Sequence, residues 1–188
     1  GSALALGATS INGLTDGYNV GDSVGLGTNA LANDDGSANL NTAVGSGALQ
    51  SNTSGYRNQA SGYYALNSNT TGVSNIANGY QSLRYNTTGG SNTANGYRAG
   101  FRVTTGTLNI GLGYGAGDAI TTGSNNTIIG DYAGTTTLAD TVVIAAGTTE
   151  RLKIDASGIQ VNGAALAAGA TSINGLTDGY YAGESVGL

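Results

Sequence analysis

The sequence predicts an all-β protein: an elongated parallel β-solenoid, or β-roll, of 17-residue coils, followed by a short β-hairpin module. An asparagine recurs every 17 residues, 34 of the 188 residues are glycine, and proline is absent. Fixed short periods indicate stacked repeats, and stacked coils need backbone N–H groups that proline lacks. The recurring residues are Asn41, Asn58, Asn75, Asn92, Asn109 and Asn126.

Small residues occupy fixed columns of this repeat. Its third position is mostly alanine, its fifth is glycine, and its fifteenth is glycine at the end of a threonine-rich turn. We expect two short strands and two turns per coil, with coils rising by ~4.8 Å. Alternate residues of a strand share a face, so the third and fifth positions predict a narrow interior.

The chain divides into four segments. Residues 1–22 form a connector and the start of a repeat unit, and residues 23–147 form a solenoid of about seven coils, with the 17-residue period running from 41 to 142. Residues 148–163 form a β-hairpin module, and residues 164–188 start a second repeat unit. Residues 8–18 recur identically as residues 170–180, an offset of 162.

Two kinds of shorter segment lie outside the coils. Residues 151–155 and 159–162 alternate apolar with polar on either side of residues 156–158, which predicts a hairpin. We expect it to form a separate module between successive solenoid arrays. The alanine-rich residues 164–170, matched by residues 2–8, suit a short helix or an axial connector.

A coil packed only on alanine and glycine buries little apolar area, at ~0.8 kcal/mol per buried CH₂. This is small compensation for ordering so much glycine. Partner chains would supply the missing burial. We therefore expect a homotrimer, packed or intertwined, in which Leu49, Leu66 and Leu83 lie between subunits.

Composition excludes several classes of function. The chain has no histidine or cysteine, and its formal charge is −5. We therefore expect no catalytic residues, no metal site, no cofactor and no nucleic-acid partner. Residues 142–146, the longest apolar stretch, are too short to insert into a membrane. Asp34 and Asp35 suit a solvated turn better than a calcium site, and residues 111–117 lack the spacing of a phosphate loop.

One column carries a candidate contact surface. Tyr63, Tyr80, Tyr97 and Tyr114 could stack on sugar rings of a host glycan or contact a receptor, with Arg98 and Gln81 beside them. The alternative, which we favour, is an aromatic ladder that stacks on itself.

Three other polar columns suit structural roles. The recurring asparagines suit a hydrogen-bonded ladder. The threonine pairs resemble ice-binding arrays only weakly, because adjacent residues of a strand point to opposite faces. The Asn-x-Ser/Thr triplets at Asn52, Asn69, Asn86 and Asn125 are expected in any repeat of this composition.

Residues 58–72 and 75–89 closely match the unit Asn-Thr-Ala-x-Gly-Tyr-x-Ala-Leu-x-x-Asn-Thr-Thr-Gly. In this the chain resembles, over residues 23–163, the tandem-repeat tail fibre proteins of bacteriophages. Residues 149–158 resemble the β-module that follows such repeats. The chain is less closely similar to the β-roll heads of trimeric autotransporter adhesins.

The resemblance implies a non-enzymatic, trimeric shaft of a virion fibre that takes part in host attachment. Its partners would be copies of itself, other fibre or baseplate proteins, and a host surface glycan or protein. The alternatives are a trimeric adhesin on a bacterial surface and a carbohydrate-binding fibre.

Overall fold

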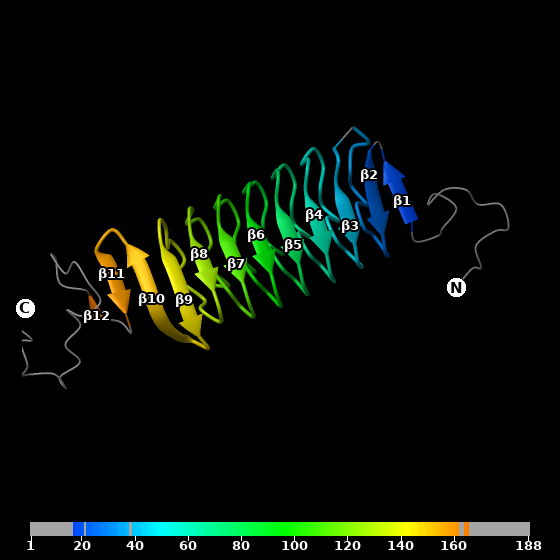
Figure 1. The fold of residues 1–188 in the computed structure, drawn as a ribbon. Helices are drawn as coiled ribbons and strands as arrows, with labels where there is room; N and C mark the ends of the chain where they lie inside the picture. The colour runs from blue at the N-terminus through cyan, green and yellow to red at the C-terminus, as the bar shows by residue number, and fades with distance from the viewer. Residues whose placement is uncertain (1–16, 21, 38, 162–163, 166–188) are drawn as a thin grey trace, which may run out of the picture.

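The computed structural model describes residues 17–20, 22–37, 39–161 and 164–165. Within these ranges the chain is all-β and has no helix that could cross a membrane. One sheet holds all the strands in chain order, and β2 to β9 run parallel as a solenoid of about seven turns, which confirms the predicted all-β solenoid (Figure 1). The strands are β1 (Gly17–Val20), β2 (Ser23–Leu26), β3 (Thr42–Val44), β4 (Gln59–Ser61), β5 (Ile76–Asn78), β6 (Thr93–Asn95), β7 (Ile110–Leu112), β8 (Thr127–Ile129), β9 (Val142–Ala146), β10 (Thr149–Asp155), β11 (Gly158–Val161) and β12 (Ala164–Ala165).

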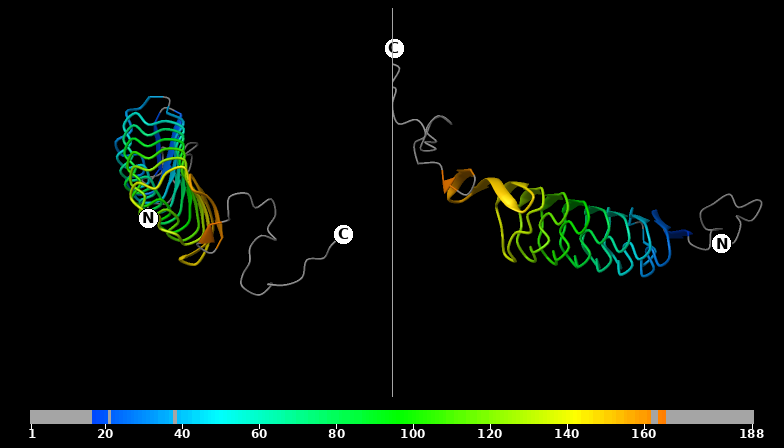
Figure 2. Two further views of the ribbon diagram at one scale, coloured as in Figure 1. Left: turned by 90° about the vertical axis from the view of Figure 1, so that its left-hand side faces the viewer. Right: turned by 90° about the horizontal axis from the view of Figure 1, so that it is seen from below.

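Most coils contain one three-residue strand and a return wall, the segment that leads from one strand to the next. Strands pair in unbroken register, so that Ala60 lies beside Ala77. The return wall also bonds from coil to coil, and the Leu66 amide donates to the Ser82 carbonyl at 3.0 Å. Viewed down the rod, the coils lie over one another (Figure 2).

The prediction of two strands per coil is wrong. The return wall consists of turns and bends instead of a second strand. Tyr64, Leu66 and Ser74 have φ values of 55°, 49° and 57°, in the left-handed region. Residues in that region cannot continue an extended chain.

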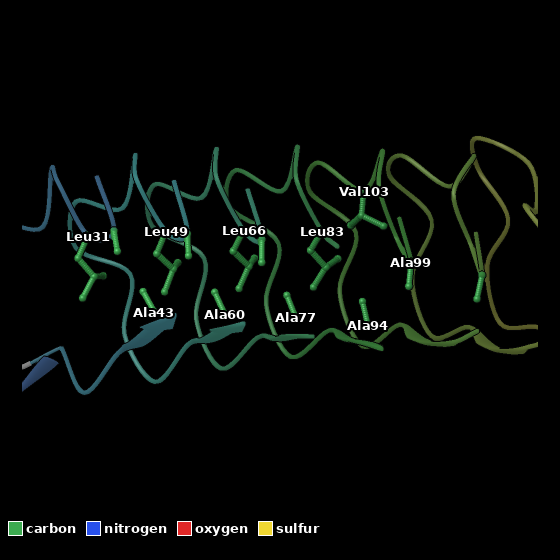
Figure 3. Close-up of a cluster of buried hydrophobic side chains, with 14 of the residues drawn as sticks. Leu31, Ala43, Leu49, Ala60, Leu66, Ala77, Leu83, Ala94, Ala99 and Val103 are labelled. Carbon is green, nitrogen blue, oxygen red and sulfur yellow. The ribbon is translucent and has the colours of Figure 1, made fainter. Parts of the chain in front are cut away.

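The hydrophobic core lies between the strands and the return wall. Alanines from the strands face leucines from the return wall across this space (Figure 3). The side chains concerned are at most 1% exposed: Ala43, Ala60, Ala77, Ala94, Leu31, Leu49, Leu66 and Leu83. Each buried leucine contributes about 1.5–3 kcal/mol.

The prediction that Leu49, Leu66 and Leu83 pack between subunits is therefore wrong. All three point into their own coil. Their φ values of 47° to 49° turn the side chain away from the surface. The single chain thus buries more apolar area than its alanine and glycine columns suggest.

The core changes composition in the later coils. Gly100 and Gly117 replace leucine in its column, and Val103, Ile120 and Ile128 fill the space instead. The void that remains there measures about 10 Å³, too small for a ligand. Packing is therefore conserved although the repeat sequence is not.

The recurring asparagines form a buried ladder along the rod. Asn75 shows the pattern: its Oδ1 accepts from the Asn92 backbone amide at 3.0 Å and from Asn92 Nδ2 at 3.1 Å. Its Nδ2 donates to Asn58 Oδ1 at 3.1 Å and to the Gly89 carbonyl at 2.9 Å. Every polar atom of this buried amide is used.

A second asparagine ladder runs beside the first. Nδ2 of Asn69 donates to Asn52 Oδ1, and Nδ2 of Asn86 donates to Asn69 Oδ1, each at 2.8 Å. The two ladders share glycine carbonyls, because Gly72 O accepts from Asn58 at 2.8 Å and from Asn69 at 3.1 Å. Val103 ends the second ladder and leaves Asn86 Oδ1 buried without a partner among the described residues.

Glycine is required where coils approach most closely. Gly62 has a φ of 137°, and a Cβ there would lie 2.7 Å from the Gly79 carbonyl carbon. At Gly72 a Cβ would lie 2.5 Å from the Gly89 carbonyl oxygen. Neither distance can hold a side chain without moving the next coil.

Antiparallel strands continue the sheet at both ends of the parallel stack. β1 pairs with β2, and β9 to β12 follow one another as antiparallel neighbours. β10 and β11 pair with Asp155 opposite Gly158, and a separate module there stays a prediction. Ala164 and Ala165 form a strand, so the helix expected at 164–170 is not found at these two positions. The matching residues 2–8 and the recurrence at 170–180 lie outside the described residues.

We predict that Asn75→Ala lowers the free energy of unfolding by about 2–4 kcal/mol, because buried donors of Asn92 lose their acceptor. Asn95→Ala is the matched control, since Asn95 is exposed on the neighbouring strand. We expect it to change the same quantity by less than ~0.5 kcal/mol. Urea unfolding of both variants measures the difference, and equal losses would contradict a stabilising ladder.

We predict that the β10–β11 turn withstands mild acid. Hydrogen bonds from Ser157 and the Lys153 ammonium, 2.9 Å away, lower the pKa of Asp155 to about 2. A lowered pKa stabilises the fold above the ordinary value of 3.8, and this contribution is lost as the pH falls towards 2. An NMR titration of the Asp155 carboxyl checks this, and a midpoint near 3.8 would show that these contacts do not form.

Candidate ligand-binding surface

The tyrosine column forms a stacked ladder on the surface. Tyr63, Tyr80, Tyr97 and Tyr114 have successive ring centroids 5.3, 5.2 and 4.9 Å apart, with planes within 14° of parallel. Each tyrosine follows a glycine that comes directly after a strand, so coil stacking sets the ring spacing. The rings stack on one another, as the aromatic-ladder interpretation predicts.

This stacking limits how sugars could contact the column. Both faces of Tyr80 and Tyr97 are covered by their neighbours, which leaves their edges and hydroxyl groups exposed. The ring centroid of Tyr64 lies 4.1 Å from that of Tyr63, and a hydrogen bond between the two side chains raises the pKa of Tyr63. Tyr114, 63% exposed, ends the ladder. A glycan contact by this column stays a prediction.

Arg98 and Gln81, the two predicted companions, both have left-handed backbone in the return wall. The Arg98 guanidinium lies over Phe101, with its Cζ 3.9 Å from the ring centroid. Its Nη2 lies 3.4 Å from Asp118 Oδ2, and its Nε is buried without a partner among the described residues. Gln81 is half-buried.

Further along the return wall, six residues form what we call the aromatic–arginine cluster: Tyr64, Arg84, Tyr85, Arg98, Phe101 and Arg102. Arg84 Cζ lies 5.0 Å from the Tyr64 centroid and 5.3 Å from that of Tyr85. The Tyr85 and Phe101 rings pack edge to face, with their centroids 4.9 Å apart. These distances suit cation–π and aromatic pairing.

This cluster was not predicted from the sequence, although the sequence contains a signal for it. The tenth and eleventh repeat positions hold small polar pairs in two coils, Gln50-Ser51 and Asn67-Ser68, but Arg84-Tyr85 and Phe101-Arg102 in the next two. A departure from the repeat at a surface column therefore marks the cluster in the sequence.

Charge is distributed unevenly along the rod. Residues 36–117 contain four arginines and no Asp or Glu, a formal charge of +4 in a chain of −5. Three of these arginines belong to the aromatic–arginine cluster. Asp118 is the first carboxylate after this stretch, and it faces both Arg98 and Arg102 at 3.4 Å.

Asp34 and Asp35 have separate structural roles. Asp34 is nearly buried, and its Oδ2 accepts from Asn41 Nδ2 at 3.4 Å and from Asn52 Nδ2 at 3.3 Å, where both ladders begin. Asp35 is exposed, and hydrogen bonds from Ser37 lower its pKa. The prediction of a solvated turn therefore holds for Asp35 but not for Asp34. The described residues contain no group of three potential metal ligands among His, Cys, Asp and Glu.

The Asn-x-Ser/Thr triplets have structural roles in three of four cases. Asn52, Asn69 and Asn86 are fully buried, which closes them to glycosylation in the folded chain. Asn125 is exposed and donates to Asp140 Oδ1 at 2.9 Å.

The threonine column bonds to the backbone. The Thr70 hydroxyl, for example, donates to the Thr87 carbonyl at 3.1 Å. Within residues 111–117, Gly111 and Leu112 belong to strand β7, which leaves no phosphate loop at that position.

Comparisons with protein-family models, curated proteins and solved structures found no match for this chain. We therefore infer the function of this surface from its own geometry.

Proposed function

We propose that this chain is a structural shaft segment of a phage tail fibre, present in the virion as a homotrimer, which supports attachment to a host surface. The observation that carries this proposal is the continuous stack of parallel coils from β2 to β9, in which the core and the first asparagine ladder run from coil to coil. Such a stack spans distance without bending at a hinge. The 162-residue recurrence fits a longer array of the same kind.

The assignment to phage rests on the resemblance of residues 58–72 and 75–89 to tandem-repeat tail fibres. A trimeric adhesin on a bacterial surface shares the coil architecture and is the alternative. A carbohydrate-binding fibre is the third candidate, and the exposed tyrosine ladder and the aromatic–arginine cluster favour it. Partners of the shaft would be other fibre or baseplate proteins.

A homotrimer needs a surface that partner chains can cover. The outward face of β7 to β11 is apolar except at Thr127 and Thr149, and six of its aliphatic side chains are 37–44% exposed. The same face of β6 carries Thr93 and Asn95. The outward apolar residues of β7 to β11 are Ile110, Leu112, Ile129, Val142, Ile144, Leu152, Ile154, Ile159 and Val161. We expect partner chains to cover this face.

We predict that the purified chain has three times its 18.4 kDa mass in solution. Replacing Ile129 and Ile144 together by lysine should release monomers, because like charges would then face one another across the interface. Asn95→Lys adds a charge to the same sheet outside the apolar region and should leave the mass unchanged. Light scattering measures all three samples, and a monomeric parent chain would refute the trimer.

We predict that antibodies raised against this segment label tail fibres on virions released by the strain that encodes it. Immunogold electron microscopy is the measurement, with pre-immune serum as the control. Labelling of intact bacterial cells but not virions would favour the adhesin instead.

A further inference from the structure

An open groove lies beside the aromatic–arginine cluster. It encloses about 440 Å³ and is lined by Ser68, Tyr85, Thr87, Arg102, Thr104 and Thr121. This volume lies within the ~300–1,000 Å³ common for small-ligand sites. Residues from four successive coils meet here, so the groove runs along the rod.

The threonine hydroxyls of the groove are polarised by the stack. Those of Thr87, Thr104 and Thr121 donate to carbonyls of the following coil at 3.1, 3.1 and 2.9 Å. Their protons are therefore used, and their oxygens remain as acceptors. Coil stacking repeats these acceptors every ~4.8 Å. They suit a ligand that carries several hydroxyl donors.

The positive charge of the groove is only partly neutralised. Arg102 is half exposed, and its Nη1 lies 3.4 Å from Asp118 Oδ1, a long distance for such a pair. Asp118 also faces Arg98 at 3.4 Å, so one carboxylate serves two guanidinium groups. Arg102 thus retains donors for an anionic group on a ligand.

Coil stacking does not explain two of the residues that line the groove, Tyr85 and Arg102. A repeat protein places identical residues in a column for structural reasons. Tyr85 and Arg102 break their column, where the preceding coils have Ser51 and Ser68. Tyr85 is 42% exposed, which costs free energy that a small polar residue would avoid. Binding of a ligand in the groove would explain why Tyr85 and Arg102 occupy these positions.

We infer that this groove binds an anionic polysaccharide, with Arg102 pairing to a carboxylate of the ligand, Tyr85 contacting a sugar ring and the threonine oxygens accepting from its hydroxyls. This inference rests on the proposed role in host attachment and specifies its ligand class. A neutral glycan would leave Arg102 without an anion. A DNA strand would bring phosphates but few hydroxyl donors for the threonine oxygens.

Isothermal titration calorimetry of the full chain tests the inference. The probes are oligosaccharides of polygalacturonate, alginate and hyaluronan, each paired with its methyl ester, which keeps the ring but removes the charge. We expect at least one acid to bind more than about tenfold tighter than its ester, as loss of a charge-assisted hydrogen bond implies. Arg102→Gln and Tyr85→Ala should each weaken that binding by a similar factor.

Arg57→Gln is the matched control, because Arg57 is an exposed arginine stacked on Tyr56 and does not line the groove. It should change the affinity by less than about twofold. If Arg57→Gln and Arg102→Gln weaken the affinity equally, the binding depends only on non-specific charge and the groove is not the site. Binding of a single-stranded DNA oligomer with the same dependence on Arg102 would overturn the ligand class.

If none of the three acids binds while light scattering and electron microscopy still show a trimeric rod, the groove inference fails and the shaft proposal stands. Loss of the rod itself would refute the shaft proposal. Circular dichroism of each variant shows whether the fold is retained, so that a lost affinity can be assigned to the groove.

Discussion

Every feature of this rod depends on coils that stack with the same backbone conformation at the same column. The backbone of one coil then lies directly against the backbone of the next, as the pairing of Ala60 with Ala77 shows. Columns in closest contact accept only glycine, represented by Gly62 and Gly72. Left-handed columns turn leucines inward. Composition, core and surface spacing are thus consequences of one period.

Stacking also explains why so many buried polar side chains are tolerated. An isolated buried amide would be costly, but an amide repeated at each coil finds its partners in its neighbours. The chain of amides has a direction, so its first member needs an acceptor, which Asp34 provides. Its last member, Asn126, accepts from the Thr141 amide at 3.3 Å. Where the second ladder stops at Val103, Asn86 Oδ1 is left unpaired.

The period made much of the architecture predictable. Spacing alone gave the parallel coils, and alternation in residues 151–155 located strand β10. The return wall was not predictable, because residues such as Leu66 and Tyr64 have no intrinsic preference for left-handed backbone. Because this backbone conformation was not predicted, the burial of Leu49 inside its own coil could not be predicted either. The buried roles of Asn52 and Asn69 were also not predictable, because Asn-x-Ser/Thr triplets are expected in any repeat of this composition.

The candidate surface was harder to predict than the fold. Tyr80 and Tyr97 occupy a repeated column, so the 17-residue period predicts that they lie one above the other on the surface. Tyr85 and Arg102 break their column, and regularity concealed them. Because stacking determines which residues repeat, the residues that depart from their column are the ones that need a reason other than stacking, such as ligand binding.

Stacking at a fixed 17-residue period is tested most directly by two internal deletions. Removing residues 75–91 takes out one whole coil and lets Asn92 stack on Asn58. Removing only the six residues 84–89 leaves a coil too short to close. Thermal unfolding followed by circular dichroism should show a cooperative transition for the 17-residue deletion and its loss for the shorter one. Equal stability of the two variants would contradict the coil as the unit of the fold.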